Sequence, residues 1–311
     1  MKIKKPKFWD YKKPNYIAYL ILPLTLITSL INTLKKTKTP QSRNIKTICI
    51  GNIYIGGTGK TPTSIKISKI ISDLKLKPVF IKKYYKDSVD EQKLLNKHGD
   101  LICDQKRLNA LNEAVENNFD VAIFDDGLQD PSINYDLKIV CFNIKNFIGN
   151  RLLIPAGPLR EKINSLSKYN AVFLNGNNEN TEQIINEIKI NNNKIKIFET
   201  IYTLVNSDLL DKKFKYLAFA GIGNPKTFNK TLVKDNFNIV SFLEFPDHYQ
   251  YTSKDIIKIK NIAKNLNAKI ITTEKDYLRI TNENNNNINF IKMELRIKNE
   301  KDLISFLKSY I

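Results

Sequence analysis

The sequence predicts an α/β protein whose main body is a mostly parallel sheet with flanking helices, joined to a second, smaller α/β lobe and preceded by an apolar N-terminal helix. Three observations predict this architecture. Short apolar runs alternate with helical stretches from Lys46 onward, which is typical of βαβ units around a parallel sheet. A glycine-rich segment stands between one such run and a helical stretch, and an uncharged apolar run lies near the N-terminus.

Taken in order, the pattern divides the chain into residues 1–39 with the apolar helix, residues 40–208 with the main body, and residues 209–311 with the smaller lobe. In the main body we expect strands at residues 47–53, 78–83, 121–126, 137–142 and 171–175, and helices at residues 62–74 and 107–117. In the smaller lobe we expect strands at residues 216–223, 238–245, 268–276 and 288–295, helices at residues 227–235 and 253–266, and a final helix. Residues 200–214 are expected to join the lobes, and the polar stretches at residues 40–44, 175–180, 191–193 and 284–287 are expected to form a linker and surface loops.

Composition limits the classes of protein. With 311 residues, 42% of them apolar, the chain can form a sizeable core and is not disordered as a whole. The three scattered cysteines, Cys49, Cys103 and Cys141, cannot form a disulfide framework, which favours a reducing compartment. The net charge of +19 favours anionic partners such as nucleic acid, phosphorylated metabolites or an anionic membrane face. A chain-wide bias toward Lys, Ile and Asn accounts for part of this charge.

The apolar run covers residues 17–34 and contains no formal charge. A helix of this length reaches about 27 Å, slightly less than the hydrocarbon thickness of a bilayer. Lysines flank it on both sides: Lys12 and Lys13 before it, and Lys35, Lys36 and Lys38 after it. Basic flanks at both ends favour a helix that lies in the membrane interface on anionic phospholipid, with a spanning helix and a buried core helix as the alternatives. Pro23 is expected to kink the run or to separate two shorter helices.

The glycine-rich segment reads GNIYIGGTGKTP and covers residues 51–62. It follows a predicted strand and precedes a predicted helix, which is the context of a phosphate-binding loop. Lys60 is expected to reach the β- and γ-phosphates of ATP, and the Thr61 hydroxyl to ligate Mg²⁺. The loop is a variant, because Tyr54 stands where the strict pattern G-x-x-x-x-G-K-[ST] has its first glycine. The predicted fold is therefore P-loop NTPase-like, and the predicted nucleotide-binding residues are Tyr54, Ile55, Gly56, Gly57, Thr58, Gly59, Lys60 and Thr61.

Two carboxylates complete the predicted nucleotide site. Asp125 and Asp126 follow directly after the apolar strand that begins at Val121. Side chains at this point lie at the carboxyl edge of a parallel sheet, where ligands bind. One carboxylate is expected to hold Mg²⁺ directly or through water, and the other to orient water or Lys60. The predicted metal ligands are Thr61, Asp125 and Asp126, and the alternative for the two carboxylates is a solvated turn.

Several motifs together resemble one family, the tetraacyldisaccharide 4'-kinases of the lipid A pathway. They are GNIYIGGTGKTP, FDDGLQ at residues 124–129, RLLIPAGPLRE at residues 151–161, AGIGNPKTF at residues 220–228, FPDHYQYT at residues 245–252 and TTEKD at residues 272–276. The N-terminal stretch, with Trp9, also resembles that family's membrane helix, so the resemblance runs over nearly the whole chain. It implies a kinase that transfers the γ-phosphate of ATP to the 4'-hydroxyl of a membrane-bound tetraacyldisaccharide 1-phosphate, giving lipid IVA. It also implies a place on the cytoplasmic face of the bacterial inner membrane, without nucleic acid or an obligate protein partner.

The resemblance also implies catalytic residues. In this family an Asp of a D-E pair and the His of the PDH segment are implicated in activating the acceptor hydroxyl, and the matching positions are Asp90 and His248. A carboxylate near an imidazole can take or relay the hydroxyl proton. The predicted domain boundaries place the two residues in different lobes, so we expect them to meet only when the lobes close. The alternatives are that Asp90 only caps a helix and that His248 is structural. Lys60 is the third predicted catalytic residue. His98 is expected in an exposed loop.

Four polar residues are predicted to bind the phosphates of the substrates. Arg107 matches a family arginine near the phosphates, Gln129 ends the FDDGLQ segment, and Arg151 and Arg160 flank PAGPL. Arginine binds phosphate through two parallel hydrogen bonds, so Arg151 or Arg160 can hold the 1-phosphate or the transferring group. The alternative for both is an exposed, salt-bridged arginine.

The chain departs from the family pattern at residues 81–92. Lys83 and Tyr84 replace the Arg and the first Gly of an Arg-Gly-Tyr-Gly turn, and Val89 and Gln92 replace a Gly and a Pro around the D-E pair. We therefore expect a different backbone path there. Two other functions remain as alternatives: a membrane-associated P-loop ATPase of the partition or assembly type, and a nucleic-acid-binding module using Tyr84 and Tyr85 among their neighbouring lysines.

Overall fold

The computed structural model describes residues 5–34, 44–85, 89–176, 180–280 and 285–311. The chain forms two compact units. The first contains residues 1–84, 99–201 and 297–311, and the second contains residues 85–98 and 202–296. Most of the predicted linker at residues 40–44, the lysines at positions 35, 36 and 38, and parts of two asparagine-rich loops lie outside the described residues.

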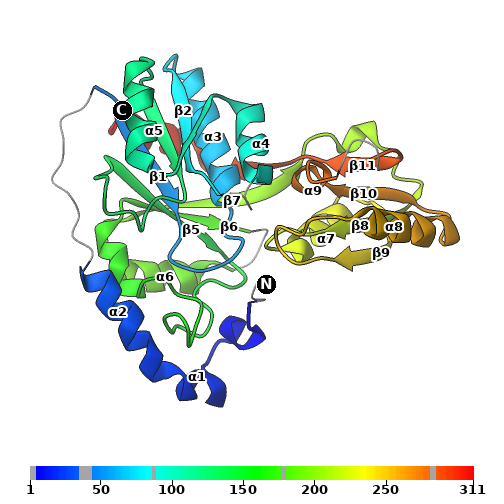
Figure 1. Ribbon diagram of the computed structural model, residues 1–311, viewed down its shortest axis with the longest axis horizontal. Coiled ribbons are helices and arrows are strands. Elements are labelled where there is room, and N and C mark those ends of the chain that lie inside the picture. The colour runs from blue at the N-terminus through cyan, green and yellow to red at the C-terminus, as the bar shows by residue number, and fades with distance from the viewer. Residues whose placement is uncertain (1–4, 35–43, 86–88, 177–179, 281–284) are drawn as a thin grey trace. The chain divides into compact units, whose positions relative to one another are not determined.

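The eight-stranded sheet has the strand order β12-β7-β6-β5-β1-β4-β2-β3 (Figure 1). Its strands are β1 (Lys46–Gly51), β2 (Pro78–Lys83), β3 (Leu101–Asp104), β4 (Val121–Asp125), β5 (Leu137–Asn143), β6 (Ala171–Asn175), β7 (Lys196–Leu204) and β12 (Met293–Ile297). β1 pairs in parallel with β4 on one side and β5 on the other, and the remaining pairs from β3 to β7 are parallel as well. All five residues of β4 are buried, as expected for a strand covered on both faces.

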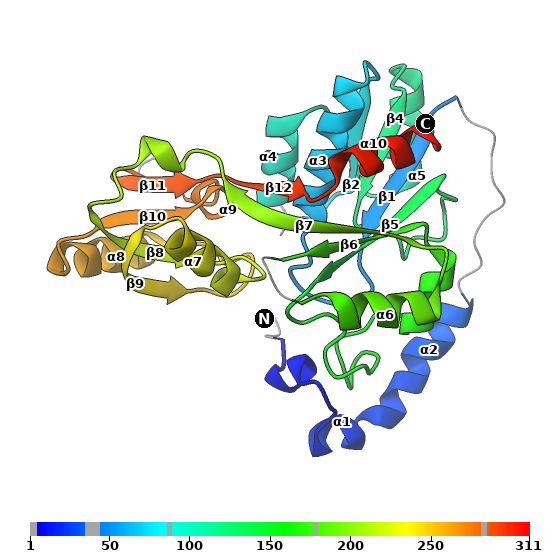
Figure 2. The ribbon, with the colours of Figure 1, turned by 180° about the vertical axis from the view of Figure 1, so that it is seen from behind.

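Helices cover both faces of this sheet. They are α3 (Lys60–Asp73), α5 (Arg107–Glu116), α6 (Glu182–Asn191) and α10 (Glu300–Lys308). The apolar residues of α5 and α6 pack on one face, and α3 and α10 lie on the other. Figure 2 shows α10 and α3 together, where Lys66 forms an ion pair with Glu300 at 2.8 Å. The predicted parallel α/β fold is thus confirmed for the main body.

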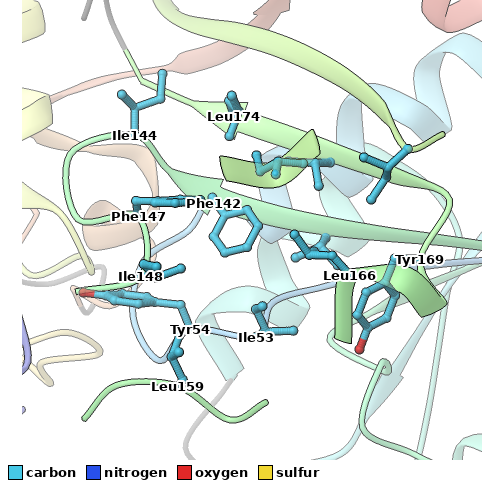
Figure 3. Packing of buried hydrophobic residues seen from close by; sticks show 14 of the residues in the cluster. Ile53, Tyr54, Phe142, Ile144, Phe147, Ile148, Leu159, Leu166, Tyr169 and Leu174 are labelled. Carbon is cyan, nitrogen blue, oxygen red and sulfur yellow. The ribbon is translucent and has the colours of Figure 1, made fainter. Parts of the chain in front are cut away.

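One buried cluster lies directly beneath the glycine-rich segment. Figure 3 shows Ile53 and Tyr54 packed among side chains of β5, β6 and the segment around Leu159. Phe142 and Phe147 stack edge to face within it, with ring centroids 5.0 Å apart. Burial of large side chains contributes about 1.5–3 kcal/mol each, so this cluster fixes the base of the loop.

The second unit contains a four-stranded sheet of order β11-β10-β8-β9, and all of its pairs are parallel. Its elements are β8 (Lys215–Ala220), β9 (Asn238–Glu244), β10 (Lys269–Thr273), β11 (Ile288–Ile291), α4 (Val89–His98), α7 (Pro225–Lys234), α8 (Ser253–Asn265), α9 (Glu274–Tyr277) and the short 3-10 helix η5 (Ser207–Leu209). α7 packs on one face and α8 on the other. The predicted second α/β lobe is confirmed. Asn224 and Pro225 begin α7 before the expected start at residue 227, and Thr252 with Asp255 forms a capping box for α8, which begins at Ser253 as predicted.

Several boundaries differ from the predictions. The strand predicted at residues 288–295 is two strands, because β11 belongs to the four-stranded sheet and β12 lies beside β7 in the eight-stranded one. The first part of the segment predicted to join the lobes is strand, since β7 extends to Leu204. Residues 297–311, which include α10, belong to the first unit, whereas α4 belongs to the second unit. His98 ends α4 and does not lie in a loop, although it is exposed as predicted. The sequence patterns did not indicate α6 or β7 as separate elements, and they gave no bounds for β3 or for α4, which the helix-capping alternative for Asp90 implied.

The N-terminal run forms the helices α1 (Tyr16–Leu20) and α2 (Thr25–Leu34), separated by the 3-10 helix η2 (Leu22–Leu24) that contains Pro23. The expected break at Pro23 is confirmed. Among the described residues, no helix has the length and apolar character needed to cross a membrane. A short 3-10 helix, η1 (Lys7–Asp10), precedes α1, and another, η4 (Ile163–Lys168), precedes β6 in the main body.

The N-terminal segment is bound to the first unit through the segment at residues 149–158. The indole N–H of Trp9 donates to the Pro155 carbonyl at 3.0 Å, and the backbone N–H of Asn150 donates to the Trp9 carbonyl at 3.0 Å. The Thr28 hydroxyl donates to the Ile154 carbonyl at 2.7 Å. The buried-core-helix alternative is wrong for this run, because most of its large apolar side chains are exposed.

Candidate active site

The glycine-rich segment turns from the end of β1 into α3. Gly59, with φ +86°, is the N-cap of α3, and Gly56 has φ +138°. Residues with a Cβ rarely adopt these backbone conformations, so glycine is needed at both positions. Lys60 and Thr61 are the first residues of the helix, where the backbone N–H groups lack intrahelical partners and the helix dipole is positive. This arrangement binds phosphate.

The PAGPL segment holds this loop in place. The N–H of Ile55 donates to the Pro158 carbonyl at 2.8 Å, and the N–H of Arg160 donates to the Ile53 carbonyl at 2.7 Å. Tyr54 forms an antiparallel bridge with Leu159. The glycine-rich segment and the PAGPL segment, which lie about 100 residues apart in the sequence, are therefore held together by backbone hydrogen bonds. Tyr54 itself is buried in the underlying core, which explains the departure from the strict loop pattern: the residue serves packing and does not face a nucleotide through its side chain.

Polar side chains of β6 and of the residue after β1 also support the loop. The Asn175 amide of β6 donates to the Thr58 carbonyl at 2.6 Å, and the amide of Asn52, which follows β1, donates to the Thr58 hydroxyl at 3.0 Å. All three residues are buried. The loop is thus preorganised by these hydrogen bonds, which reduces the ordering cost when an anion binds.

Thr61 and Asp125, both predicted to be metal ligands, lie in direct contact. The Thr61 hydroxyl donates to Asp125 Oδ2 at 3.1 Å, and the Ser64 hydroxyl donates to Asp125 Oδ1 at 3.4 Å. The sequence reasoning missed a third donor: Lys82 Nζ lies 2.7 Å from the same Oδ2. Both charged side chains are buried, with 6% of Lys82 and 0% of Asp125 exposed. The carboxylate therefore already has a cation and two hydroxyl groups around it.

Asp126 follows β4 and has φ +67°, a left-handed conformation that Asp tolerates better than most residues. Its carboxylate lies 3.1 Å from Arg160 Nη1 and 4.0 Å from Lys60 Nζ. Burial raises the pKa of this carboxyl, but Lys60, Arg160 and Lys82 together outweigh burial and hold the pKa below its ordinary value. Asp126 is thus an ionised group at neutral pH, in contact with the loop lysine as predicted.

Gln129 and Arg107 fix the backbone that carries the two carboxylates. Gln129 accepts a hydrogen bond from Arg160 at 3.0 Å, and its amide donates to Glu161 at 2.9 Å. Arg107 donates to the Asp126 carbonyl and pairs with Asp130 at 3.1 Å. In this arrangement Arg107 and Gln129 hold the FDDGLQ turn, and Arg160 is the arginine that lies beside the loop lysine and Asp126.

Arg151 lies in a different environment. Its guanidinium forms two hydrogen bonds with Glu187 of α6, at 2.6 and 2.8 Å, and 56% of its side chain is exposed. This is the salt-bridged arrangement that the sequence left open as the alternative. The structure does not bring Arg151 together with Lys60, Asp125 or Asp126.

A second cluster lies entirely within the second unit. His248 Nδ1 is 3.2 Å from Asp90 Oδ1, which brings the two predicted residues together. The expectation that they meet only on closure of two lobes is wrong, because Asp90 belongs to α4 and α4 packs on α9 in the same unit as His248. His248 has φ +57°, a left-handed conformation that is uncommon for residues other than Gly but that His, like Asn and Asp, adopts more often than most.

Two further cations surround Asp90, and sequence reasoning did not assign them. Arg279 donates to Asp90 Oδ2 through Nε at 3.1 Å and through Nη2 at 2.6 Å. Lys275 Nζ lies 3.5 Å from the same oxygen and 3.0 Å from Glu91. Burial raises the pKa of Asp90, but the hydrogen bond from His248 and the charges of Lys275 and Arg279 outweigh it and hold the pKa well below its usual range. Lys275 belongs to the TTEKD motif, so that motif was the available signal; nothing in the sequence marked Arg279.

The oxygen donors near the loop suit a magnesium ion. Hydroxyl and carboxylate oxygens are the ligands that Mg²⁺ prefers, and Thr61 and Asp126 supply them beside the loop. Across the described ranges, no three His, Cys, Asp or Glu side chains are grouped in a way that could hold a metal ion. The donor set fits a magnesium ion that arrives on nucleotide phosphates, which needs only one or two protein ligands.

Comparison with known proteins agrees with these motifs. The family model described as tetraacyldisaccharide-1-P 4'-kinase matches residues 17–311. A protein of Pelagibacter ubique named tetraacyldisaccharide 4'-kinase is 53% identical over 307 residues, covering 99% of this chain and 98% of that protein. Another of the same name, from Rickettsia typhi, is 36% identical over 317 residues and covers 96% of each chain.

The chain belongs to the tetraacyldisaccharide 4'-kinase family. Family membership rules out the alternative of a partition or assembly ATPase. The fold of LpxK from Aquifex aeolicus, whose crystal structure is in complex with ATP, is similar: the TM-score is 0.68 at 23% identity, covering 94% of this chain and 99% of that one.

Proposed function

We propose that the chain transfers the γ-phosphate of ATP to the 4'-hydroxyl of a membrane-bound tetraacyldisaccharide 1-phosphate, giving the lipid A precursor lipid IVA. The shared name of the relatives supports this substrate and this reaction. The observation that carries the proposal is the loop of Lys60 and Thr61 at a helix N-terminus, beside Asp125 and Asp126. Phosphoryl transfer from a nucleoside triphosphate needs this combination of anion binding and fixed charge.

On the ATP side, the backbone of residues 54–61 binds the β- and γ-phosphates, and Lys60 stabilises the charge that develops on the transferring group. Arg160 is a second source of positive charge, because its guanidinium lies beside Asp126 and 29% of its side chain is exposed. Arg107 and Gln129 act through the FDDGLQ turn that they hold. Arg151 can take part only if it leaves Glu187.

Magnesium bound with ATP would neutralise part of the phosphate charge. Thr61 and Asp126 are the residues that would hold it, through the hydroxyl and the carboxylate described above. Asp125 orients the Thr61 hydroxyl by accepting its hydrogen bond at 3.1 Å. Asp126, kept ionised by the neighbouring cations, also fixes Lys60.

On the acceptor side, Asp90 and His248 act as a pair that receives the hydroxyl proton. Asp90 stays ionised at neutral pH because three cationic or donor groups stabilise its charge. It therefore holds the His248 ring in a fixed orientation through Nδ1. A modest base suffices in phosphoryl transfer, since positioning and charge stabilisation supply most of the rate.

The N-terminal segment is proposed to bind the cytoplasmic face of the bacterial inner membrane. Four of its large apolar side chains are highly exposed: Tyr16 and Leu20 at 80%, Leu26 at 71% and Leu30 at 60%. Exposed apolar side chains on short helices, with lysines nearby and a net charge of +19, fit an interface of anionic phospholipid. The segment would hold the enzyme where its lipid substrate is concentrated.

The reaction is tested with the full-length protein in detergent, supplied with ATP, Mg²⁺ and a tetraacylated disaccharide 1-phosphate. Mass spectrometry should show one added phosphate on the lipid. Hydrolysis of ATP without phosphorylated lipid would refute the proposed acceptor.

The catalytic pair is tested with Asp90→Ala, His248→Ala and the double variant, and with His98→Ala as the matched control because it is the other histidine of the chain. Each single change should lower kcat by roughly 10²-fold or more, with little change in KM for ATP. The double variant should be hardly slower than the slower single variant, because residues that act as a unit are not additive. Fully multiplicative losses would show that the two residues act independently.

A further inference from the structure

Lys82 is a buried charged residue of the nucleotide site to which the proposed reaction assigns no role. It is the fifth residue of β2, and β2 pairs in parallel with β4 so that Ile81 stands opposite Phe124. The next residues along the two strands are Lys82 and Asp125, whose side chains meet at 2.7 Å. Only 6% of the Lys82 side chain is exposed, so the ammonium group has little access to water.

The surroundings of Asp125 account for both of its oxygens. Oδ2 accepts hydrogen bonds from Lys82 and from the Thr61 hydroxyl, and Oδ1 accepts one from Ser64. A carboxylate that binds a divalent cation directly needs an oxygen that faces the cation. Here the ammonium group already occupies that side of Oδ2, and a second cation on the same oxygen would be repelled by it.

We propose that the Lys82 ammonium is a permanent counter-ion of Asp125. It supplies at this position the positive charge that a divalent metal would otherwise bring. ATP binding by this loop therefore depends only weakly on divalent metal. The inference rests on the proposed function, because it assumes that the loop binds ATP.

The physical consequence concerns repulsion between Asp125 and the phosphates. An uncompensated buried carboxylate beside the loop would repel the phosphate groups of metal-free ATP, and Mg²⁺ would remove this repulsion. With Lys82 in place, the charges of Lys82 and Asp125 cancel whether or not metal is present. Nearby unit charges in a site of effective dielectric about 20 change affinity by more than a factor of ten, so the effect of removing Lys82 is measurable.

The experiment measures the Kd of a fluorescent ATP analogue for the full-length protein, once with excess EDTA and once with saturating Mg²⁺. The ratio of the two Kd values reports the metal dependence of binding. For the wild type we expect a ratio below about ten. Lys82→Met should raise the ratio by at least about tenfold, mostly by weakening binding in EDTA, whereas Lys82→Arg should keep it near the wild-type value.

Lys66→Met is the matched control, because it removes another ion-paired lysine from the same unit, on the face of α3 toward Glu300. It should leave both Kd values unchanged. If Lys82→Met leaves the ratio unchanged, Lys82 is only a structural residue and the proposal is overturned. If the wild type binds the analogue under neither condition, the proposed function itself fails.

A second comparison decides the question even if Lys82→Met does not fold. Asp125→Asn keeps the ammonium group and removes its partner, while the double variant Lys82→Met, Asp125→Asn removes both charges. In EDTA the single variant should bind the analogue about tenfold more tightly than the double variant, because the released ammonium charge then acts on the phosphates. Equal affinities would show that the charge of Lys82 does not reach the nucleotide, and would overturn the proposal.

Discussion

Replacing Arg279 by Met tests how the Asp90 cluster is held together. The guanidinium joins two buried carboxylates of the second unit: it contacts Asp90 at 2.6 Å and Asp276 at 2.8 Å, and it also donates to the Gly221 carbonyl at 2.7 Å. All three charged side chains are at most 1% exposed. Methionine is an unbranched, flexible and uncharged side chain, so it fills much of the vacated space while the two carboxylates lose their shared cation.

The expected loss in the free energy of unfolding follows from these distances. Unit charges about 3 Å apart interact by about 5–6 kcal/mol at an effective dielectric of about 20. Desolvation offsets part of this attraction, and removing one partner of a buried pair costs about 3–5 kcal/mol because the other charge is left uncompensated. We expect Arg279→Met to lower the free energy of unfolding of the second unit by this amount at pH 7. Arg279→Lys should cost less, because it keeps the charge and loses the paired hydrogen bonds.

The loss of stability caused by Arg279→Met should depend on pH in a direction set by the ionisation of Asp90. Its folded-state pKa is depressed, so Asp90 stabilises the folded wild type above its unfolded pKa of about 3.9, and this stabilisation is lost as the pH falls through the lower folded pKa. In the variant the pKa of Asp90 rises, and the carboxyl takes up a proton at a higher pH. The difference in stability between wild type and variant should therefore be largest near pH 7 and shrink toward pH 4.

Hydrogen exchange measured by mass spectrometry at several pH values is the suitable assay, because it reports the second unit separately from the first. Peptides of α4, β8 and α9 should lose protection in Arg279→Met, while ATP binding by the first unit is retained. A loss below about 1 kcal/mol, or one that does not change between pH 7 and pH 4, would refute the reasoning.

Three other outcomes are expected. Lys60→Ala should lower kcat by roughly 10²-fold while the melting temperature stays the same, because the lysine charge acts on the transferring phosphate; turnover near that of the wild type would remove the phosphate-loop assignment. Gly157→Ala should lower the melting temperature, since a Cβ there would lie 2.1 Å from Asn150 Oδ1 and 2.4 Å from the Leu152 carbonyl oxygen, and an unchanged melting curve would contradict this. Deleting residues 1–38 should release the protein from anionic vesicles in a flotation assay and raise KM for the lipid but not for ATP; a truncated protein that still floats would indicate a second membrane-binding surface.

Local patterns were sufficient for the elements and motifs whose residues are contiguous. Alternating apolar runs predicted β1, β2, β4, β5 and β6, and the glycine-rich segment predicted the loop and the start of α3. Pro23 predicted a break in the N-terminal helical run, because proline cannot donate the backbone hydrogen bond. The pairing of Thr61 with Asp125 was also predictable, since a loop and a strand end at the carboxyl edge of one parallel sheet must lie close together.

Tertiary structure alone decided which segments belong together. Chain order placed α4 with the main body and residues 297–311 with the smaller lobe, but α4 packs on α9 in the second unit, and residues 297–311, with α10, belong to the first. Asp90 is thereby enclosed by Arg279, a residue 189 positions away, and Asp125 is paired with Lys82 on a neighbouring strand. A sequence pattern shows which faces are apolar and where a helix begins. It does not show which distant cation a buried carboxylate will meet, because that depends on which strands and helices become neighbours when the chain folds. In this chain, those neighbours decide the charge of both candidate sites.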